Sequence, residues 1–141
     1  MEFGELLKLF LLDLQRLFRS RIVKGDLTLP QILLISSIPD DGIDMTSMSQ
    51  QLGVDNSTLT RLVDVLIKRK WVEKTKDKYD RRITLLTLTD EGQDTQETIE
   101  ERIDHYGDIV YEAIPLEDRE EVKEILSSFH WTLSKILLKH E

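Results

Sequence analysis

Residues 44–88 constrain the fold of this chain more than any other part of its sequence. Asp44 belongs to the residue types that cap helix N-termini, so we expect a short helix from there to Leu52. Gly53 tolerates the left-handed backbone that ends a helix, and Asp55 follows it as the cap of another helix. Two helices joined by a tight turn are therefore predicted.

The second of these helices is expected from Asn56 to about Lys70. Its apolar residues follow helical spacing and predict one buried face: Leu59, Leu62, Val63, Leu66 and Ile67. The opposite face is polar and carries Ser57, Thr60, Arg61, Asp64 and Lys68. A helix of this kind packs on a core with one face and presents the other to solvent or to a partner.

A β-hairpin is expected after this helix. Residues 71–76 and 83–88 are rich in strand-forming side chains, and they flank the charged segment 77–82, which makes the hairpin tip basic. Helix, glycine turn, helix and charged hairpin, in that order, predict a winged helix-turn-helix.

Further helices are expected on both sides of this lobe. The N-terminal segment carries an apolar stripe at helical spacing: Phe3, Leu6, Leu7, Phe10, Leu11, Leu14, Leu17 and Phe18. Thr28 and Pro30 begin a nearly all-apolar helix that ends at Pro39. Thr89 begins a long helix that runs to Pro115, and an amphipathic helix then reaches almost to the C-terminus. The predicted class is mainly α with a small β-hairpin wing.

Charge is distributed unevenly along the chain, whose net charge is −8. Residues 55–82 hold nine basic and five acidic residues, a local net charge of +4. Residues 90–124 hold fourteen acidic and three basic residues, a local net charge of −11. The acidic total argues against a nucleic-acid partner, but a basic module set against an acidic scaffold favours one. The alternative is chance unevenness of a solvated surface.

The polar helix suits the major groove of double-stranded DNA, which is about 12 Å wide and admits one α-helix. Candidate contacts nearest its N-terminal end are Ser57, Thr58, Thr60 and Arg61, and Lys68 is a further candidate. Hydroxyl groups serve bases or phosphates, whereas the guanidinium group of Arg61 suits bidentate contact with guanine. The alternative is that these are ordinary solvated positions of a surface helix.

The hairpin tip suits the minor groove, where an arginine meets the most negative potential over A·T-rich DNA. Arg81 and Arg82 are the candidates. Asp80 either pairs with one of them only to stiffen the turn, or orients one while the other reaches the groove. Lys76 and Lys78 complete the basic candidates of the wing.

Catalytic and membrane functions are disfavoured. The chain has no cysteine, which excludes thiolate metal sites, cysteine nucleophiles and thiol switches. His105, His130 and His140 are too scattered for a local metal motif, and no P-loop, GxGxxG or GxSxG motif is present. We therefore expect no enzyme activity, cofactor or metal. No long apolar window suggests a membrane span, and early acidic residues disfavour a signal peptide, so a cytoplasmic location is expected.

The chain length suggests a single domain over residues 1–141. We expect a DNA-binding lobe at about 28–90 and dimerisation helices at about 1–22 and 91–141. Helices outside the lobe expose their apolar stripes unless another chain covers them, and two-fold symmetry is the usual closure. A homodimer would meet successive major grooves about 34 Å apart, which predicts a pseudo-palindromic operator with half-sites about 10 bp apart.

Three segments resemble the MarR family of bacterial and archaeal transcription regulators: residues 53–66, 80–82 and 88–92. The likeness runs from about residue 5 to residue 138. It implies a homodimer whose first and last helices interlock while each winged lobe enters DNA. It carries over Ser57, Thr58, Thr60 and Arg61 as recognition-helix positions, and Asp80, Arg81 and Arg82 as the wing motif. Lys70-Trp71 departs from the family pattern, which usually has glycine before an apolar residue.

The resemblance also implies a repressor that a small aromatic or anionic effector releases from DNA, although no residue in the sequence identifies an effector pocket. The resulting hypothesis is a sequence-specific DNA-binding regulator. The alternative is a winged-helix module that binds protein through its acidic helices without sequence-specific DNA binding. Salt separates the two, because DNA affinity falls steeply as salt rises and a mostly apolar protein contact changes little.

Overall fold

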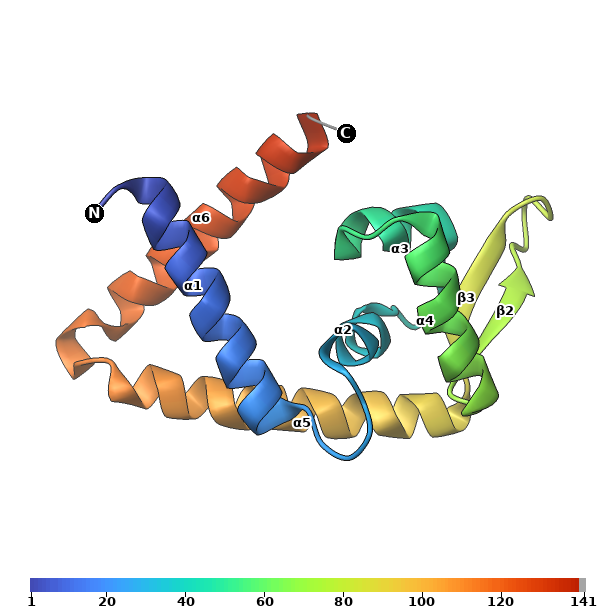
Figure 1. The fold of residues 1–141 in the computed structure, drawn as a ribbon, viewed down its shortest axis with the longest axis horizontal. Coiled ribbons are helices and arrows are strands. Elements are labelled where there is room, and N and C mark those ends of the chain that lie inside the picture. The colour runs from blue at the N-terminus through green and yellow to red at the C-terminus, as the bar shows by residue number, and fades with distance from the viewer. Residues whose placement is uncertain (140–141) are drawn as a thin grey trace. The chain divides into compact units, whose positions relative to one another are not determined.

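The computed structural model describes residues 1–139, and the chain divides into two compact units, Met1–Ile103 and Asp104–Glu141. Helix α5 (Asp90–Ala113) begins in the first unit and ends in the second. Before it, the first unit contains α1 (Phe3–Leu17), a π-helical turn (Phe18–Ile22), α2 (Leu29–Ser37), β1 (Ile43–Asp44), α3 (Met45–Leu52), α4 (Asn56–Lys68), β2 (Val72–Lys76) and β3 (Thr84–Leu88). The predicted class, mainly α with a small β-hairpin wing, is confirmed (Figure 1).

Helix α2 contributes four residues to the buried core, which accords with its nearly all-apolar sequence. Thr28 and Gln31 form a reciprocal cap, in which the Thr28 hydroxyl accepts from the Gln31 N–H and the Gln31 amide accepts from the Thr28 N–H. Ile32, Leu34 and Ile35 are fully buried. A capped start and an apolar body thus fix this helix inside the lobe.

The helix-turn-helix follows the predicted capping pattern. The Asp44 carboxylate accepts from the Ser47 N–H at 2.9 Å and begins α3, and Gly53 ends it with a φ of 69°. The Asp55 carboxylate accepts from the Thr58 N–H at 2.7 Å and begins α4. Helix α4 ends at Lys68, slightly before the expected boundary. Its buried face consists of Leu59, Val63 and Leu66.

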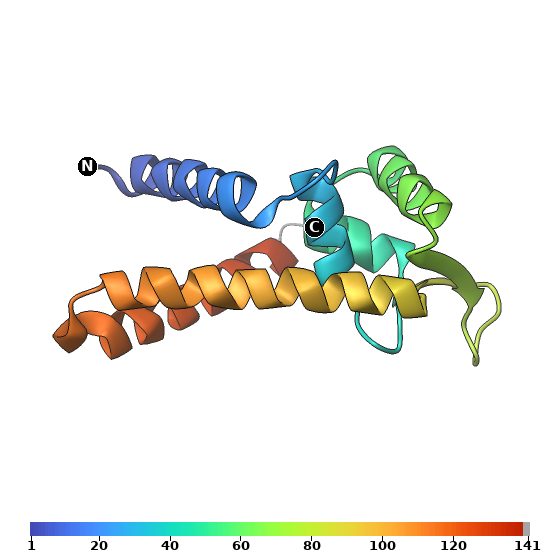
Figure 2. The ribbon, with the colours of Figure 1, turned by 90° about the horizontal axis from the view of Figure 1, so that it is seen from below.

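The predicted hairpin is present, and it belongs to a three-stranded antiparallel sheet in the order β1-β3-β2. Val72 lies opposite Leu88 and Lys76 lies opposite Thr84, so the two long strands pair along their whole length. Strand β1 pairs Ile43 with Leu86 and was not predicted, because two residues carry no readable alternation. The hairpin loop projects from the end of the sheet (Figure 2).

The joint between the wing and α5 explains two sequence features. Lys70 has a φ of 65°, the left-handed region that glycine adopts at lower cost, so the departure from the family pattern leaves the turn intact. The Thr89 hydroxyl donates to the Lys70 carbonyl at 2.6 Å and accepts from the Gly92 N–H at 3.0 Å. Gly92 packs against the backbone of Trp71, where any Cβ atom would clash with the Trp71 carbonyl.

Three side chains in the first part of α5 form hydrogen bonds with α2 and with the segments just before and after it. Gln96 donates to the carbonyls of Ile35 and Ile38 at 2.8 and 2.9 Å, where α2 ends. Arg102 donates to the Ile22 carbonyl at 2.8 Å, and Glu100 accepts from the hydroxyl of α2 Ser36. The lobe is therefore held to α5 by specific polar contacts as well as by buried Ile99.

The second unit comprises the end of α5, a 3₁₀ turn (Leu116–Asp118) after Pro115, and α6 (Arg119–Lys139). Arg119 donates to the carbonyls of Ile114 and Glu112, and the Tyr111 hydroxyl donates to the Glu120 carboxylate, so polar contacts connect the end of α5 with the start of α6. The apolar side chains of α6 are exposed at Ile125, Leu126, Trp131, Leu133, Ile136, Leu137 and Leu138. No helix among the described residues is long and apolar enough to cross a membrane.

Candidate nucleic-acid interface

The N-terminal end of α4 presents an ordered set of polar side chains. The Ser57 hydroxyl donates to the Asp55 carboxylate at 2.9 Å, and the Thr60 hydroxyl donates to the Asn56 carbonyl at 2.8 Å. Both hydroxyls keep lone pairs that can accept from a base or a bridging water. Ser57 and Thr60 are exposed, whereas Thr58 is half-buried.

Arg61 carries a positive charge near this end of the helix. Its side chain is exposed, and one guanidinium nitrogen lies 3.4 Å from the Thr58 hydroxyl, one turn earlier. Lys68 is also exposed but stands seven residues further along α4, about 10 Å away by helical rise. The two cations can therefore meet different parts of a partner surface.

Asp55 connects the cap of α4 with these side chains. Hydrogen bonds from the Thr58 N–H and then from the Ser57 hydroxyl lower the pKa of the Asp55 carboxyl group. The hydrogen bonds thus favour the ionised form of the cap, so a negative charge lies close to this exposed end of the helix.

The wing tip, residues 77–82, is held by a carboxylate-centred turn. The Asp77 carboxylate accepts from the N–H groups of Tyr79 and Asp80 at 3.0 and 2.8 Å. The Asp77 N–H donates to the Ile83 carbonyl, and the Ile83 N–H donates to the Asp80 carbonyl, each at 3.0 Å. These bonds close the loop, so its side chains leave a defined backbone.

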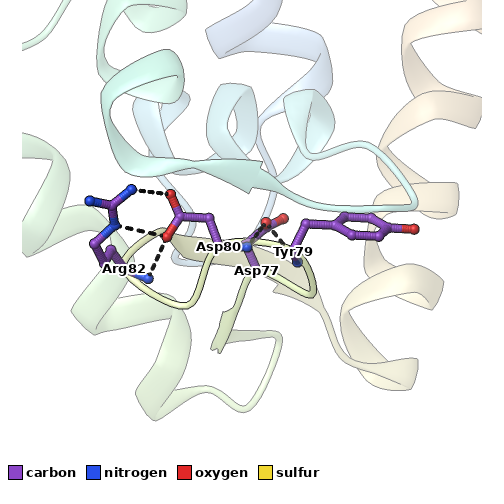
Figure 3. Close-up of polar contacts among 4 residues, drawn as sticks. All are labelled: Asp77, Tyr79, Asp80 and Arg82. Carbon is purple, nitrogen blue, oxygen red and sulfur yellow. Dashed lines mark hydrogen bonds and ion pairs between the residues drawn. The ribbon is translucent and has the colours of Figure 1, made fainter.

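Asp80 pairs with Arg82 and not with Arg81. Two guanidinium nitrogens of Arg82 lie 3.0 Å from the two carboxylate oxygens of Asp80, and the Arg82 N–H adds a third bond at 3.1 Å (Figure 3). This pairing lowers the pKa of the Asp80 carboxyl group and raises that of the Arg82 guanidinium. Arg81 is exposed, and it forms no hydrogen bond or ion pair within residues 1–139.

The two lysines of the wing lie near its tip. Lys76 ends β2, and its ammonium group donates to the Thr84 hydroxyl across the hairpin at 3.2 Å. Lys78 is exposed within the tip. The basic candidates of the wing are thus brought together at one end of the hairpin.

Sequence patterns did not predict a set of contacts around Arg69, at the C-terminal end of α4. Arg69, at the C-terminal cap of α4, forms an ion pair with Asp26, and its guanidinium carbon lies 4.9 Å from the centre of the Trp71 ring. The hydrogen bond from Arg69 lowers the pKa of the Asp26 carboxyl group. These partners lie 43 residues apart, so no local spacing could have indicated the pair. These contacts tie the α1–α2 connection to the end of α4.

A cavity of about 180 Å³ lies between the C-terminal half of α1 and the winged lobe. Gln15 in α1 and Arg19 in the π-helical turn provide the polar groups of the lining. The Arg19 guanidinium donates a hydrogen bond to the Gln15 side-chain oxygen at 3.3 Å. The remaining lining is mostly apolar: Leu29, Pro30, Leu33, Leu52, Val54 and Leu62. The cavity joins segments distant in sequence, so no motif predicted it.

The histidines show no metal cluster. Within residues 1–139, no group of three or more histidine, cysteine, aspartate or glutamate side chains could hold a metal ion. The rings of His105 and His130 lie beside the neighbouring rings of Tyr106 and Trp131, respectively. His140 lies outside the described residues.

Comparison with known proteins identifies relatives of the lobe and of the whole fold. The model of the MarR family matches residues 27–84. The HTH-type transcriptional regulator SarZ of Staphylococcus haemolyticus is 31% identical over 77 residues, which cover 54% of this chain and 52% of that protein. The chain thus spans about half the length of the curated relatives it matches.

Solved structures extend the likeness along the chain. A mutant of MarR from E. coli superposes with a TM-score of 0.78 at 22% identity, covering 92% of this chain and 96% of its own. Bordetella bronchiseptica BpsR, whose DNA binding is regulated by 6-hydroxynicotinic acid, superposes with a TM-score of 0.72 at 21% identity, covering 92% and 93%. At these identities the likeness shows a shared fold.

Proposed function

We propose that the chain is a transcriptional regulator of the MarR family, whose model matches residues 27–84, and that it binds double-stranded DNA in a sequence-specific manner. One observation carries the proposal: a single lobe presents the exposed N-terminal end of α4 together with a closed, basic wing tip. Each feature alone is common on protein surfaces, but together they match the two elements with which a winged helix reads two grooves.

In this proposal α4 lies in the major groove. Arg61 contacts a guanine through its guanidinium group, Ser57 and Thr60 contact bases or phosphates, and half-buried Thr58 supports Arg61 through its hydroxyl. Lys68, further along the helix, contacts a phosphate, because an exposed ammonium group is a compact charge without a preferred base pattern.

The wing lies in the adjacent minor groove. Arg81, which has no partner within the described chain, enters the groove, and Arg82 is oriented along its edge by Asp80. Lys76 and Lys78 add positive charge toward the phosphates. The division of roles between the arginines follows from the observed ion pair, since Asp80 restrains only one of them.

The functional unit that we propose is a homodimer. Helix α1 contains no buried residue, and Phe10, Leu11 and Leu14 are about half exposed. Helix α6 likewise exposes Leu126 and Leu137. A second copy of the chain would cover such surfaces with two-fold symmetry, and the operator would be a pseudo-palindrome with half-sites about 10 bp apart.

We further propose that a small aromatic anion releases the dimer from DNA. The cavity beside α1 supports this, because Arg19 and Gln15 can bind a carboxylate while the apolar walls receive a ring. An apolar cavity of about 150 Å³ is known to hold benzene, so a single-ring compound fits a space of this size. Repression, the usual mode in the family, is the proposed output.

Selection of bound sequences from a random 30-base-pair library at near-physiological salt tests the function without assuming an operator. Enrichment of a palindrome with half-sites one helical turn apart is the expected result. Absence of any enriched sequence from a folded protein would contradict the proposal and favour the protein-binding module. Affinity for the selected operator should also fall steeply as salt rises.

Two single variants on α4 sharpen this test. Arg61→Ala should cost about 1–3 kcal/mol on the selected operator and relax the preference at one position in each half-site. Lys68→Ala is the matched control on the same helix, and it should weaken binding to all sequences alike and reduce the salt slope by about 1. Selection with Arg61→Ala that returns an unchanged operator would demote Arg61 to a phosphate contact.

A further inference from the structure

Tyr79 is the most exposed large apolar side chain among the described residues, with 91% of its surface accessible. It stands in the wing tip between Lys78 and the Asp80–Arg82 pair. No ring contact, cation–π contact or side-chain hydrogen bond involves it within residues 1–139. The fold therefore gains nothing from the ring, although an exposed aromatic surface is unfavourable in water.

The backbone of Tyr79 is nevertheless held in place. Its N–H donates to the Asp77 carboxylate, which also accepts from the Asp80 N–H. Figure 3 shows the ring of Tyr79 directed away from the Asp80–Arg82 pair. The tip thus has a charged side and an aromatic side, and both leave the same closed turn.

We propose that Tyr79 is a further DNA contact, which packs its ring against the sugar edge of the minor groove beside the wing arginines. This inference rests on the proposed function, since it requires the wing to meet DNA. The minor groove is about 6 Å wide, which admits a flat ring edge-on, and apolar side chains are used by other proteins to wedge against its walls. The contact removes the exposed ring from water at the place where cations bring the tip to the phosphates.

A contact through the ring differs from the other wing contacts in its response to salt. Lys76 and Lys78 act by neutralising phosphates, so their contribution declines as salt rises. Packing of a ring against sugars releases no counterions, so its contribution is nearly independent of salt. The wing would then combine a steering component with a short-range component that depends on groove shape.

Variants of the full-length protein, measured on the selected operator, test this role. Tyr79→Ala should weaken binding about tenfold, as loss of an aromatic packing contact does, and should leave the salt slope unchanged. Tyr79→Phe retains the ring and should restore affinity to within about twofold. Lys78→Ala is the neighbouring control, and it should reduce the salt slope by about 1. Hydroxyl-radical footprints should lose protection only at the flanking minor groove in Tyr79→Ala.

Each other outcome overturns the inference in a recognisable way. Equal affinity of Tyr79→Ala and wild type on the operator would show that the ring makes no contact, while the proposed function stands. An equal loss in Tyr79→Phe and Tyr79→Ala would assign the contact to the hydroxyl and a phosphate instead. If the wild type selects no DNA sequence, the proposed function fails and the role of Tyr79 fails with it. Since the side chain is exposed, unfolding temperatures should be unchanged in all variants.

Discussion

The winged lobe buries many of its apolar side chains, whereas the terminal helices α1 and α6 leave many of theirs exposed. In α4 the residues Leu59, Val63 and Leu66 are fully buried. Helix α1 has no buried residue, and no described side chain of α6 is buried either. The lobe therefore completes its core within one chain, whereas α1 and α6 have apolar surface left over that a second chain is expected to cover.

The same two regions also differ in how their helices begin. Helices α2, α3 and α4 each begin with a side-chain cap, from Thr28, Asp44 and Asp55. Helix α1 begins at Phe3, and its N-cap residue, Glu2, forms no side-chain capping hydrogen bond. Caps and a closed core make a lobe that specifies its own local structure, while α1 depends more on packing for its stability.

The largest effect is expected from charged residues on the exposed apolar face of α6. Replacing Leu126 and Leu137 together by aspartate places two charges on the apolar face and should raise the dimer dissociation constant by at least about 100-fold. Sedimentation equilibrium measures the change. Ser127→Asp, on the same helix at an exposed polar position, is the control and should leave the dimer intact. A double variant that sediments like the wild type would remove α6 from the proposed interface.

The core of the lobe should respond differently. Leu59→Ala should lower the free energy of unfolding by about 3 kcal/mol, because it leaves a cavity in a closed core. Urea unfolding followed by circular dichroism, carried out at two protein concentrations, measures this free energy of unfolding. Val65→Ala, on the exposed side of α4, should change it by less than about 1 kcal/mol. A loss for Leu59→Ala as small as that for Val65→Ala would contradict a self-contained core.

A smaller, stabilising effect is expected at the helix-to-wing turn. Lys70→Gly should raise the free energy of unfolding by about 0.5–1 kcal/mol, because lysine pays a steric cost at a φ of 65° that glycine avoids. Thermal and urea unfolding measure it. Lys74→Gly, within β2, should instead destabilise the lobe, since glycine weakens a strand. Destabilisation by Lys70→Gly would show that the lysine side chain contributes more than its backbone costs.

The smallest effect concerns pH. Hydrogen bonds from Thr58 and Ser57 lower the pKa of Asp55, so its stabilising contribution is present above about pH 4 and is lost as pH falls through the lowered folded-state pKa. Asp55→Asn keeps a capping side chain that does not titrate. Urea unfolding of the two proteins between pH 7 and pH 2.5 should show the wild type losing stability relative to the variant in acid. Parallel curves would mean that the charge of the cap contributes nothing.

The winged lobe could be predicted from sequence because its signals are local. Asp44, Gly53 and Asp55 fix the helix-turn-helix through contacts within a few residues, and the hairpin follows from two strand-forming runs around a charged tip. The candidate side chains of α4 followed from the same spacing. Their contacts with DNA remain predictions.

Tertiary structure decided what no local period encodes. It added the two-residue strand β1, joined Arg69 to Asp26 and enclosed the cavity beside α1, whereas the local conformation of the wing turn paired Asp80 with Arg82 rather than Arg81. Helical and strand periods report which face of an element is buried, but not which distant residue meets it. Local signals thus fix the elements of the lobe and their order, whereas long-range packing selects which distant side chains meet, such as Arg69 and Asp26.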